Sequence, residues 1–227
     1  RVGEVHGALG YYFNRGALRT ENDLTGLHAS GESSLLNDSS EKSDRENPLP
    51  IGFCPKTDRI PYLDGTLEPE AWNSAEIFPF FGDDTFPETF VALMCDSEHL
   101  FVGITAKQTN PTATVPGGPR MGDADMSEFD RIEIALDPDR DFTGFYHFTF
   151  DCRGWVSESC QGDTLWNPQI YVANMTTEDG WVAEIAIPWK ELSDTAPAAG
   201  NVWGIALRRI LPGEGFSSWN GVGFLRL

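Results

Sequence analysis

The stretch from Phe129 to Asp151 constrains the fold more than any other part of the chain. In its first half apolar residues recur at every second position, at Ile132, Ile134 and Leu136. The second half alternates in the same way, with Tyr146, Phe148 and Phe150. Because successive side chains of a β-strand point to opposite faces, both halves predict strands with one buried face.

The residues between these two runs predict a tight reversal of the chain. The segment DPDRDFTG carries Pro138 and Gly144 among aspartates, which supply a fixed φ, side-chain acceptors and a permissive glycine. The sequence therefore predicts an antiparallel hairpin. Its second face is polar and displays Glu133, His147 and Thr149.

Further runs of strand length follow the same pattern along the chain. We expect strands at 59–63, 76–81, 89–96, 100–107, 155–159, 169–176, 180–188, 201–210 and 223–227. Only short helical turns are expected, at 68–75 and 189–192, and no long amphipathic helix separates the strands. About ten short strands of this kind predict an all-β fold, an antiparallel β-sandwich. The long loop from Gln108 to Ser127 is expected to be functional.

The chain of 227 residues divides unevenly. Residues 14–50 are mostly polar and rich in serine, a composition that buries too little apolar surface to offset the loss of chain entropy. We expect 1–56 to be an extension or linker, and 57–227 to be the sandwich domain. Because the chain begins with Arg1, we expect it to be either a piece of a longer protein, tethered to other domains, or a processed chain.

The net charge of −19 restricts the partners. It argues against nucleic acid and against anionic membranes, because phosphate groups would repel the chain. No apolar run is long enough to span a bilayer. An extracellular, periplasmic or cell-surface location is expected.

The four cysteines, Cys54, Cys95, Cys152 and Cys160, include no CxxC pair and no nearby histidine, so their spacing does not favour a zinc site. Either Cys152 and Cys160 meet across a loop, or all four are ordinary thiols.

Seven segments in order resemble a known family. They are the run from Ile60 to Trp72, TFVALMCDSEHLFVGI, EFDRIEIALDP, FYHFTFDCRG, GWVAEIAIPWKEL, VWGIALRRI, and SSW with a terminal FLRL. Over roughly 59–227 they resemble the carbohydrate-binding modules of family 9 and their DOMON-like relatives. The resemblance implies a jelly-roll or immunoglobulin-like sandwich that holds an oligosaccharide or polysaccharide end on one polar sheet face.

The resemblance also implies site residues. The D-x-x-E strand motif falls on Asp130 and Glu133, the polar residue after the IPW turn on Arg208, and one clamp tryptophan on Trp219. A carboxylate accepts from sugar hydroxyls, a guanidinium donates in a fork, and an indole stacks on a pyranose. The polar face adds His147 and Thr149.

Two positions depart from the family pattern. Ser127 stands where the second clamp aromatic is expected, and Thr149 where a basic residue is expected. Phe129, Trp155 or Trp166 could supply a replacement ring. Arg208 could instead pair with Glu184, whereas the remaining tryptophans Trp72, Trp189 and Trp203 are expected in the core.

Structural calcium is a further implication of the resemblance. The oxygen-rich candidates are Asp64, Asp96, Asp123, Asp125, Asp137, Asp139 and Asp141, each of which could equally be a turn residue.

Two other functions remain open. DOMON-like relatives hold haem b with Met and His or Lys ligands, for which Met94, Met121, Met126 and His147 are candidates. A purely structural domain would bind nothing. No catalytic constellation is recognisable, so we expect no catalysis within this segment; a glycoside hydrolase is compatible as the parent protein.

Overall fold

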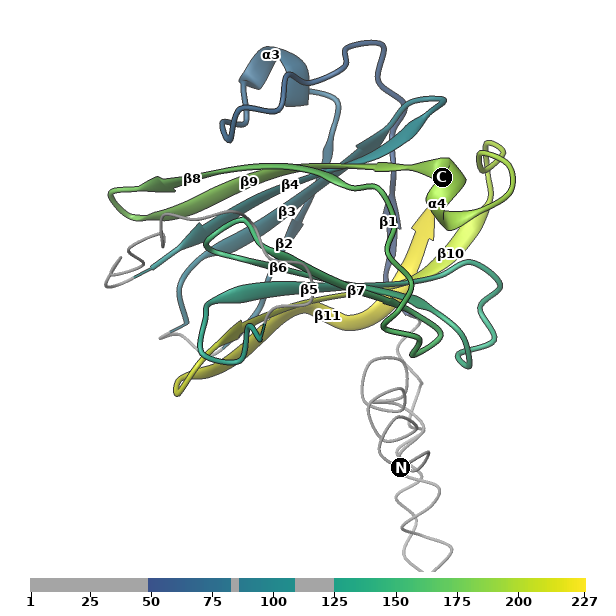
Figure 1. Ribbon diagram of the computed structural model, residues 1–227. Helices are drawn as coiled ribbons and strands as arrows, with labels where there is room; N and C mark the ends of the chain where they lie inside the picture. The colour runs from purple at the N-terminus through teal and green to yellow at the C-terminus, as the bar shows by residue number, and fades with distance from the viewer. Residues whose placement is uncertain (1–48, 83–85, 109–124) are drawn as a thin grey trace, which may run out of the picture.

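Two stacked β-sheets make up the described part of the chain. The computed structural model describes residues 49–82, 86–108 and 125–227. Figure 1 shows the sheets as two layers, with one short helix outside them and the other at one end of the sandwich. The predicted all-β sandwich is confirmed.

Sheet A is the six-stranded layer, with the order β1-β11-β10-β5-β6-β7. Its strands are β1 (Ile51–Phe53), β5 (Arg131–Asp137), β6 (Tyr146–Asp151), β7 (Val156–Cys160), β10 (Val202–Leu211) and β11 (Gly215–Arg226). All neighbours are antiparallel except β1, which runs parallel to β11. The predicted hairpin is β5 and β6, and β5 also pairs with β10. It therefore lies inside the sheet, where strands on both sides can add polar groups to its outer face.

Sheet B is the five-stranded layer, with the order β2-β3-β4-β9-β8 and antiparallel pairing throughout. Its strands are β2 (Glu76–Pro79), β3 (Thr89–Cys95), β4 (His99–Lys107), β8 (Tyr171–Thr177) and β9 (Gly180–Pro188). The helical turn α4 (Trp189–Leu192) follows Pro188 directly. Both strand hairpins expected from the sequence are therefore present.

The hydrophobic core fills the space between the sheets. Sheet A contributes Ile132, Ile134, Leu136, Phe148 and Phe150, and sheet B contributes Val102, Ile104, Ile185 and Ile187, all buried. These residues occupy every second position of their strands, as the alternation predicted. Trp72, Trp189 and Trp203 are also buried, which confirms the expectation for them.

A cap made by residues 63–75, including α3 (Pro69–Trp72), covers part of the outer face of sheet B (Figure 1). The carboxylate of Glu184 on β9 accepts hydrogen bonds of 2.9 Å from the backbone N–H groups of Asp64 and Gly65 and from the indole of Trp72. Gly65 has a φ of +92°, which suits glycine at this predicted turn. One buried carboxylate thus fastens the cap to the sheet.

Two expectations about the start of the domain are corrected. Residues 59–63 form no strand, and Pro61, which lacks an N–H donor, stands in an irregular segment. By contrast, β1 pairs with β11 although its residues were assigned to the extension of 1–56. Residues 51–53 therefore belong to sheet A, and residues 1–48 lie outside the described part.

The four cysteines are free thiols. Cys160 pairs in register with Tyr146 at one end of the β6–β7 hairpin, whereas Cys152 follows Asp151 at the other end. These two residues therefore cannot bridge within this fold.

Candidate functional site

A line of polar side chains crosses the outer face of sheet A. Strand register places Arg208 beside Ser218 and Glu133, Glu133 beside Thr149, and Thr149 beside Ser157. Directly opposite residues of antiparallel strands project from the same face. We call these five residues, Ser218, Arg208, Glu133, Thr149 and Ser157, the polar row.

Glu133 is the centre of the row. Its Oε2 accepts hydrogen bonds from Arg208 Nη2 at 2.6 Å and Nε at 3.2 Å, and its Oε1 accepts one from Arg131 Nε at 3.3 Å. The side chain is 8% exposed. Burial raises the pKa of Glu133 above its ordinary value, and the positive charge of Arg208 opposes this shift. A carboxylate held between two guanidinium groups is thus fixed in orientation.

Arg131 connects this carboxylate to the preceding turn. Its Nη1 donates to the carbonyl oxygens of Met126 and Ser127, each at 3.2 Å. Burial, followed by repulsion from Arg208, lowers the pKa of Arg131. Sequence reasoning did not select Arg131, although its position two residues before Glu133 puts it on the same face.

His147 lies two residues before Thr149 in β6, on the same face as the row, opposite Ala135. Its Nε2 is 4.0 Å from Oε2 of Glu133. Burial, with a smaller contribution from Arg208, lowers the pKa of His147 to about 4. The imidazole is therefore neutral at pH 7, and its contact with Glu133 is polar but is not an ion pair.

The structure contradicts the expectation that Trp219 is an exposed stacking platform. Trp219 belongs to β11 and not to a loop, it is 7% exposed, and its ring meets Phe78 edge-on at a centroid distance of 4.9 Å. Residues 217 and 219 of β11 face the core, because Ser217 pairs with the buried Arg209. Trp219 packs the sandwich interior and cannot stack on a ligand outside it.

Asp130 also lies on the inner side, which corrects its assignment to the sugar-binding face. Its carboxylate accepts two hydrogen bonds from Arg209, at 2.9 and 2.7 Å, and one each from the Trp181 indole and the Gln108 amide, both at 2.6 Å. Its parity with Ile132, visible in the sequence, could have placed it there. The carboxylate holds the two sheets together.

Arg208 pairs with Glu133 and not with Glu184, which lies on the outer face of sheet B under the cap.

Phe216, which the sequence analysis did not select, is an exposed aromatic ring beside the row. It is 39% exposed, and its centroid is 5.8 Å from the guanidinium carbon of Arg208. Its position two residues before Ser218 in β11 was the available signal.

The rings considered as replacement clamps have other contacts. The guanidinium of Arg153 lies 3.3 Å from the centroid of Phe129 and 3.9 Å from that of Trp155, so it occupies one face of each ring. Trp166 packs against Tyr146 and Phe148. The ring of Phe216, by contrast, is exposed and lies near the guanidinium of Arg208.

Three aspartates of the β5–β6 turn form an acidic cluster: Asp137, Asp139 and Asp141 each place a carboxylate oxygen within 4.8 Å of the others. Burial raises the pKa of Asp137, whereas hydrogen bonds from Thr143 lower the pKa of Asp141. Carboxylate oxygens are the ligands that Ca²⁺ prefers, so the donor set fits calcium.

The other candidate aspartates serve turns. Backbone N–H groups donate to the carboxylates of Asp64, Asp96 and Asp125. Asp123 and Met121 lie outside the described residues, as does most of the loop at 108–127.

Two of the candidate haem ligands are separated by the sandwich. Met94 lies under the cap on the outer face of sheet B, whereas His147 lies on the outer face of sheet A. They cannot bind one haem iron together.

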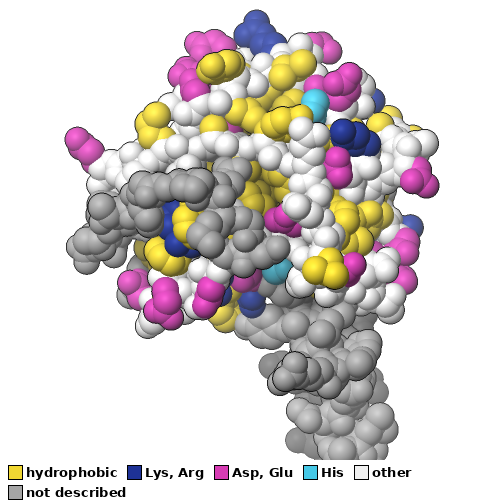
Figure 2. All heavy atoms as spheres, in the orientation of Figure 1, with side chains coloured by type: hydrophobic (Ala, Val, Ile, Leu, Met, Phe, Trp, Pro, Cys, Tyr) yellow, Lys and Arg dark blue, Asp and Glu magenta, His cyan; other side chains and the backbone are white. Residues whose placement is uncertain are grey.

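The molecular surface is consistent with the acidic composition. On the face shown in Figure 2, acidic side chains are more frequent than basic ones. No helix in the described ranges has the length and apolar character needed to cross a membrane.

Neither a family model nor a curated protein sequence matches the chain. Solved structures do. A carbohydrate binding module family 9 from Caldicellulosiruptor kristjanssonii in complex with cellotriose is 17% identical, with a TM-score of 0.57 over 78% of this chain and 93% of that one. The same module in complex with glucose is 16% identical, with a TM-score of 0.58 over 78% and 95%. A Bacteroides uniformis protein thought to bind carbohydrate is 13% identical, with a TM-score of 0.58 over 78% and 98%. The described part of the chain therefore has the fold of the family 9 carbohydrate-binding modules.

Proposed function

We propose that this chain is a non-catalytic module that binds the end of a glucose-containing glycan on the outer face of sheet A. The observation that carries the proposal is the polar row. In it, Glu133 lies 2.6 Å from Arg208, and residues with hydroxyl groups flank this pair on both sides. The fold shared with modules solved in complex with glucose and cellotriose supports this choice of ligand.

Each group of the row has a role in this proposal. The carboxylate of Glu133 accepts from two sugar hydroxyls, and the guanidinium of Arg208 donates to a ring or hydroxyl oxygen. The hydroxyls of Thr149 and Ser157 both donate and accept. Phe216 offers an apolar surface for the C–H face of the sugar. Together they supply directional hydrogen bonds with one aromatic contact.

The experiment is calorimetric titration of the protein with glucose and cellotriose. We expect Glu133→Gln, which keeps the shape but removes the charge, to weaken binding at least tenfold, which corresponds to about 1.4 kcal/mol. Glu88→Gln is the matched control, because Glu88 forms an exposed ion pair with Lys107 away from the row. Equal affinity of the Glu133→Gln and wild-type proteins, or no binding to any glycan in a broad array, would refute the proposal. The second result would favour a structural role.

The cellular setting follows from the same proposal. A module that recognises glycan ends belongs in a longer secreted or cell-surface protein, joined to domains that process polysaccharides, of which a glycoside hydrolase is one example. Proteomic detection of the full protein in culture medium or cell envelope fractions would test this location.

A structural calcium ion at Asp137, Asp139 and Asp141 is part of the proposal. Bringing three carboxylates together is unfavourable without a cation, so bound Ca²⁺ would stabilise the β5–β6 turn. We expect millimolar CaCl₂ to raise the melting temperature of the wild-type protein and to leave that of Asp139→Asn unchanged. A wild-type protein whose melting temperature is the same in CaCl₂ and in EDTA would exclude the ion.

A further inference from the structure

A cavity lies beside sheet B, the layer opposite to the polar row. It has a volume of about 440 Å³ and is bounded by the β3–β4 turn, the start of β8, the junction of β9 with α4, and the segment after α4. Small-molecule sites commonly have volumes from about 300 Å³ upward. The cavity lies where sheet B meets α4, and none of its lining residues belongs to the polar row.

The walls of the cavity are held rigidly. Trp189 donates its backbone N–H to the carbonyl of Glu98 at 2.9 Å and its indole N–H to the carbonyl of Asp96 at 3.1 Å. The carboxylate of Asp96 accepts the N–H groups of Glu98 and His99, both at 2.7 Å. These bonds fix the β3–β4 turn on α4, so the cavity is preformed.

An aromatic surface lines one side. Tyr171 is 44% exposed, and its hydroxyl accepts a hydrogen bond of 2.7 Å from Gln169. Its ring meets His99 edge-on at 6.4 Å, and His99 in turn lies against Phe101 at 5.6 Å. The ring of Tyr171 is therefore positioned and still presents apolar surface to solvent, as a stacking contact with a sugar requires.

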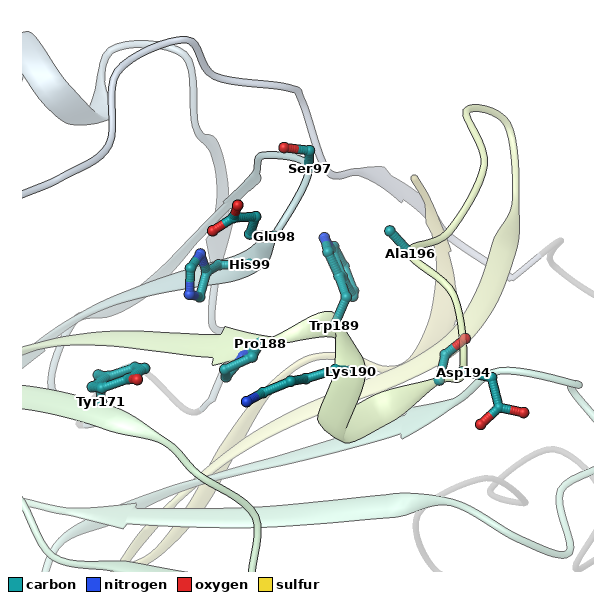
Figure 3. A pocket seen from close by; sticks show the side chains of 10 residues that line it. Ser97, Glu98, His99, Tyr171, Pro188, Trp189, Lys190, Asp194 and Ala196 are labelled. Atoms are coloured by element: carbon teal, nitrogen blue, oxygen red, sulfur yellow. The ribbon is translucent and has the colours of Figure 1, made fainter.

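Polar groups of opposite charge flank this surface. Figure 3 shows Glu98 and His99 on one side of Pro188, with Lys190 extending toward Tyr171 on the other. A carboxylate accepts from hydroxyls and an ammonium donates to them, so a vicinal diol can bridge the two. Nδ1 of His99 is buried and makes no hydrogen bond to any described residue.

The charges select the class of ligand. The acidic residues Glu98 and Asp194 outnumber Lys190 in the lining of the cavity, and the whole chain carries a net charge of −19. An anion would be repelled, whereas a neutral polyhydroxylated ring gains both the aromatic contact and the hydrogen bonds.

We propose that the cavity between Tyr171, His99, Glu98 and Lys190 is a second saccharide site that takes a single neutral pyranose. The choice of a sugar as ligand rests on the proposed function of the polar row. The cavity itself shares no residue with the row. Two sites on opposite layers would let one module contact two glycan chains.

The test is a ¹H–¹⁵N NMR titration of the protein with glucose, which reports the two sites separately. The indole N–H of Trp189 and the amide of His99 report the cavity, and the amides of Glu133 and Thr149 report the polar row. We expect both sets to shift in the wild-type protein. In Glu133→Gln the cavity signals should still shift with the wild-type dissociation constant.

Tyr171→Ala is expected to weaken binding at the cavity roughly tenfold and to leave the row signals unchanged. Tyr62→Ala, which removes an exposed tyrosine elsewhere, is the control and should alter neither set. Cavity signals that do not move with glucose, or that move equally in Tyr171→Ala, would overturn the second site. Row signals that do not move while cavity signals do would instead refute the proposed function and leave the cavity site standing.

Discussion

Arg208 and Arg209 are neighbours in β10, yet their ion pairs lie on opposite faces of sheet A. Arg209 donates to Asp130 at 2.9 and 2.7 Å, to Thr89 Oγ1 at 2.8 Å and to the Lys107 carbonyl at 2.7 Å. It is fully buried and bound from both sheets. The Arg208–Glu133 pair keeps an edge toward solvent, beside hydroxyl groups and the exposed Phe216.

The difference shows that residue type alone does not decide the role of an ion pair. Asp130 and Arg209 have their hydrogen-bonding groups engaged by the protein, so their contribution is to join the layers. Glu133 and Arg208 are oriented by each other at a face that a ligand can approach. Variants of the inner pair should therefore lower the stability of the protein, whereas variants of the outer pair should mainly lower its affinity for a ligand.

The largest effect is expected from Arg209→Met. This change leaves the Asp130 carboxylate buried without its cation, and we expect a loss of about 3–5 kcal/mol in the free energy of unfolding. Urea denaturation followed by tryptophan fluorescence measures it. The double variant Asp130→Asn, Arg209→Met should recover part of the loss, and sugar affinity per folded molecule should not change. A loss below about 1 kcal/mol would show that the inner pair is not structural.

Acid is expected to lower the free energy of unfolding because His147, close to the Arg208–Glu133 pair, is buried in its neutral form. The folded protein holds the pKa of this imidazole near 4, whereas the unfolded chain takes up a proton near 6.5. The unfolded state therefore binds more protons between these values, so stability present above pH 6.5 is lost as the pH falls toward 4. The full loss is about 3 kcal/mol. The test is to measure the urea midpoints of the wild-type and His147→Asn proteins at pH 7 and pH 4.5. If both midpoints fall equally with pH, His147 does not have the lowered pKa.

Arg208→Met is expected to act mainly on binding. Glu133 keeps Arg131 as a partner at 3.3 Å, so the loss of unfolding free energy should be smaller than for Arg209→Met, about 1–2 kcal/mol. Glucose affinity should fall at least tenfold. Calorimetric titration measures the glucose affinity, and urea denaturation measures the free energy of unfolding. If stability falls as far as in Arg209→Met while affinity is retained, the two pairs have the same role.

The smallest effect is a pH dependence of affinity. Because burial raises the pKa of Glu133, protonation starts at a higher pH than for an ordinary glutamate. Its protonated form accepts hydrogen bonds from hydroxyls less well, so affinity should decline a few-fold as the pH falls, and Glu133→Gln should lose this dependence. Titrations of both proteins with glucose at pH 7, 6 and 5 test this expectation. If the affinity changes with pH equally in the wild-type and Glu133→Gln proteins, the raised pKa of Glu133 is contradicted.

The sequence predicted the sandwich because the fold depends on a pattern that is readable residue by residue. Ile132, Ile134 and Leu136 face the core as their spacing required, and the hairpin of β5 and β6 formed where the turn residues indicated. Glu133, Arg208, His147 and Thr149 were placed correctly on one polar face.

The errors concern Trp219, Asp130 and Phe216, of which Trp219 alone depends on pairing with a neighbouring strand. Trp219 lies outside the strand expected at 223–227, whereas in the structure β11 runs through it and pairs with β10 on both sides of it. Asp130 was assigned by motif position although its parity with Ile132 placed it inside. Phe216 was not selected, although its position two residues before Ser218 puts it on the same face of β11.

The strand order of sheet A also bears on how the site comes into being during folding. Hairpins β5–β6–β7 and β10–β11 join residues that are close in sequence, whereas the β5–β10 contact joins Glu133 to Arg208 across 75 positions. Contacts of such long range form late, because closing a long loop costs entropy before any pairing is gained. The polar row is therefore complete only after β5 and β10 have paired at the centre of the sheet.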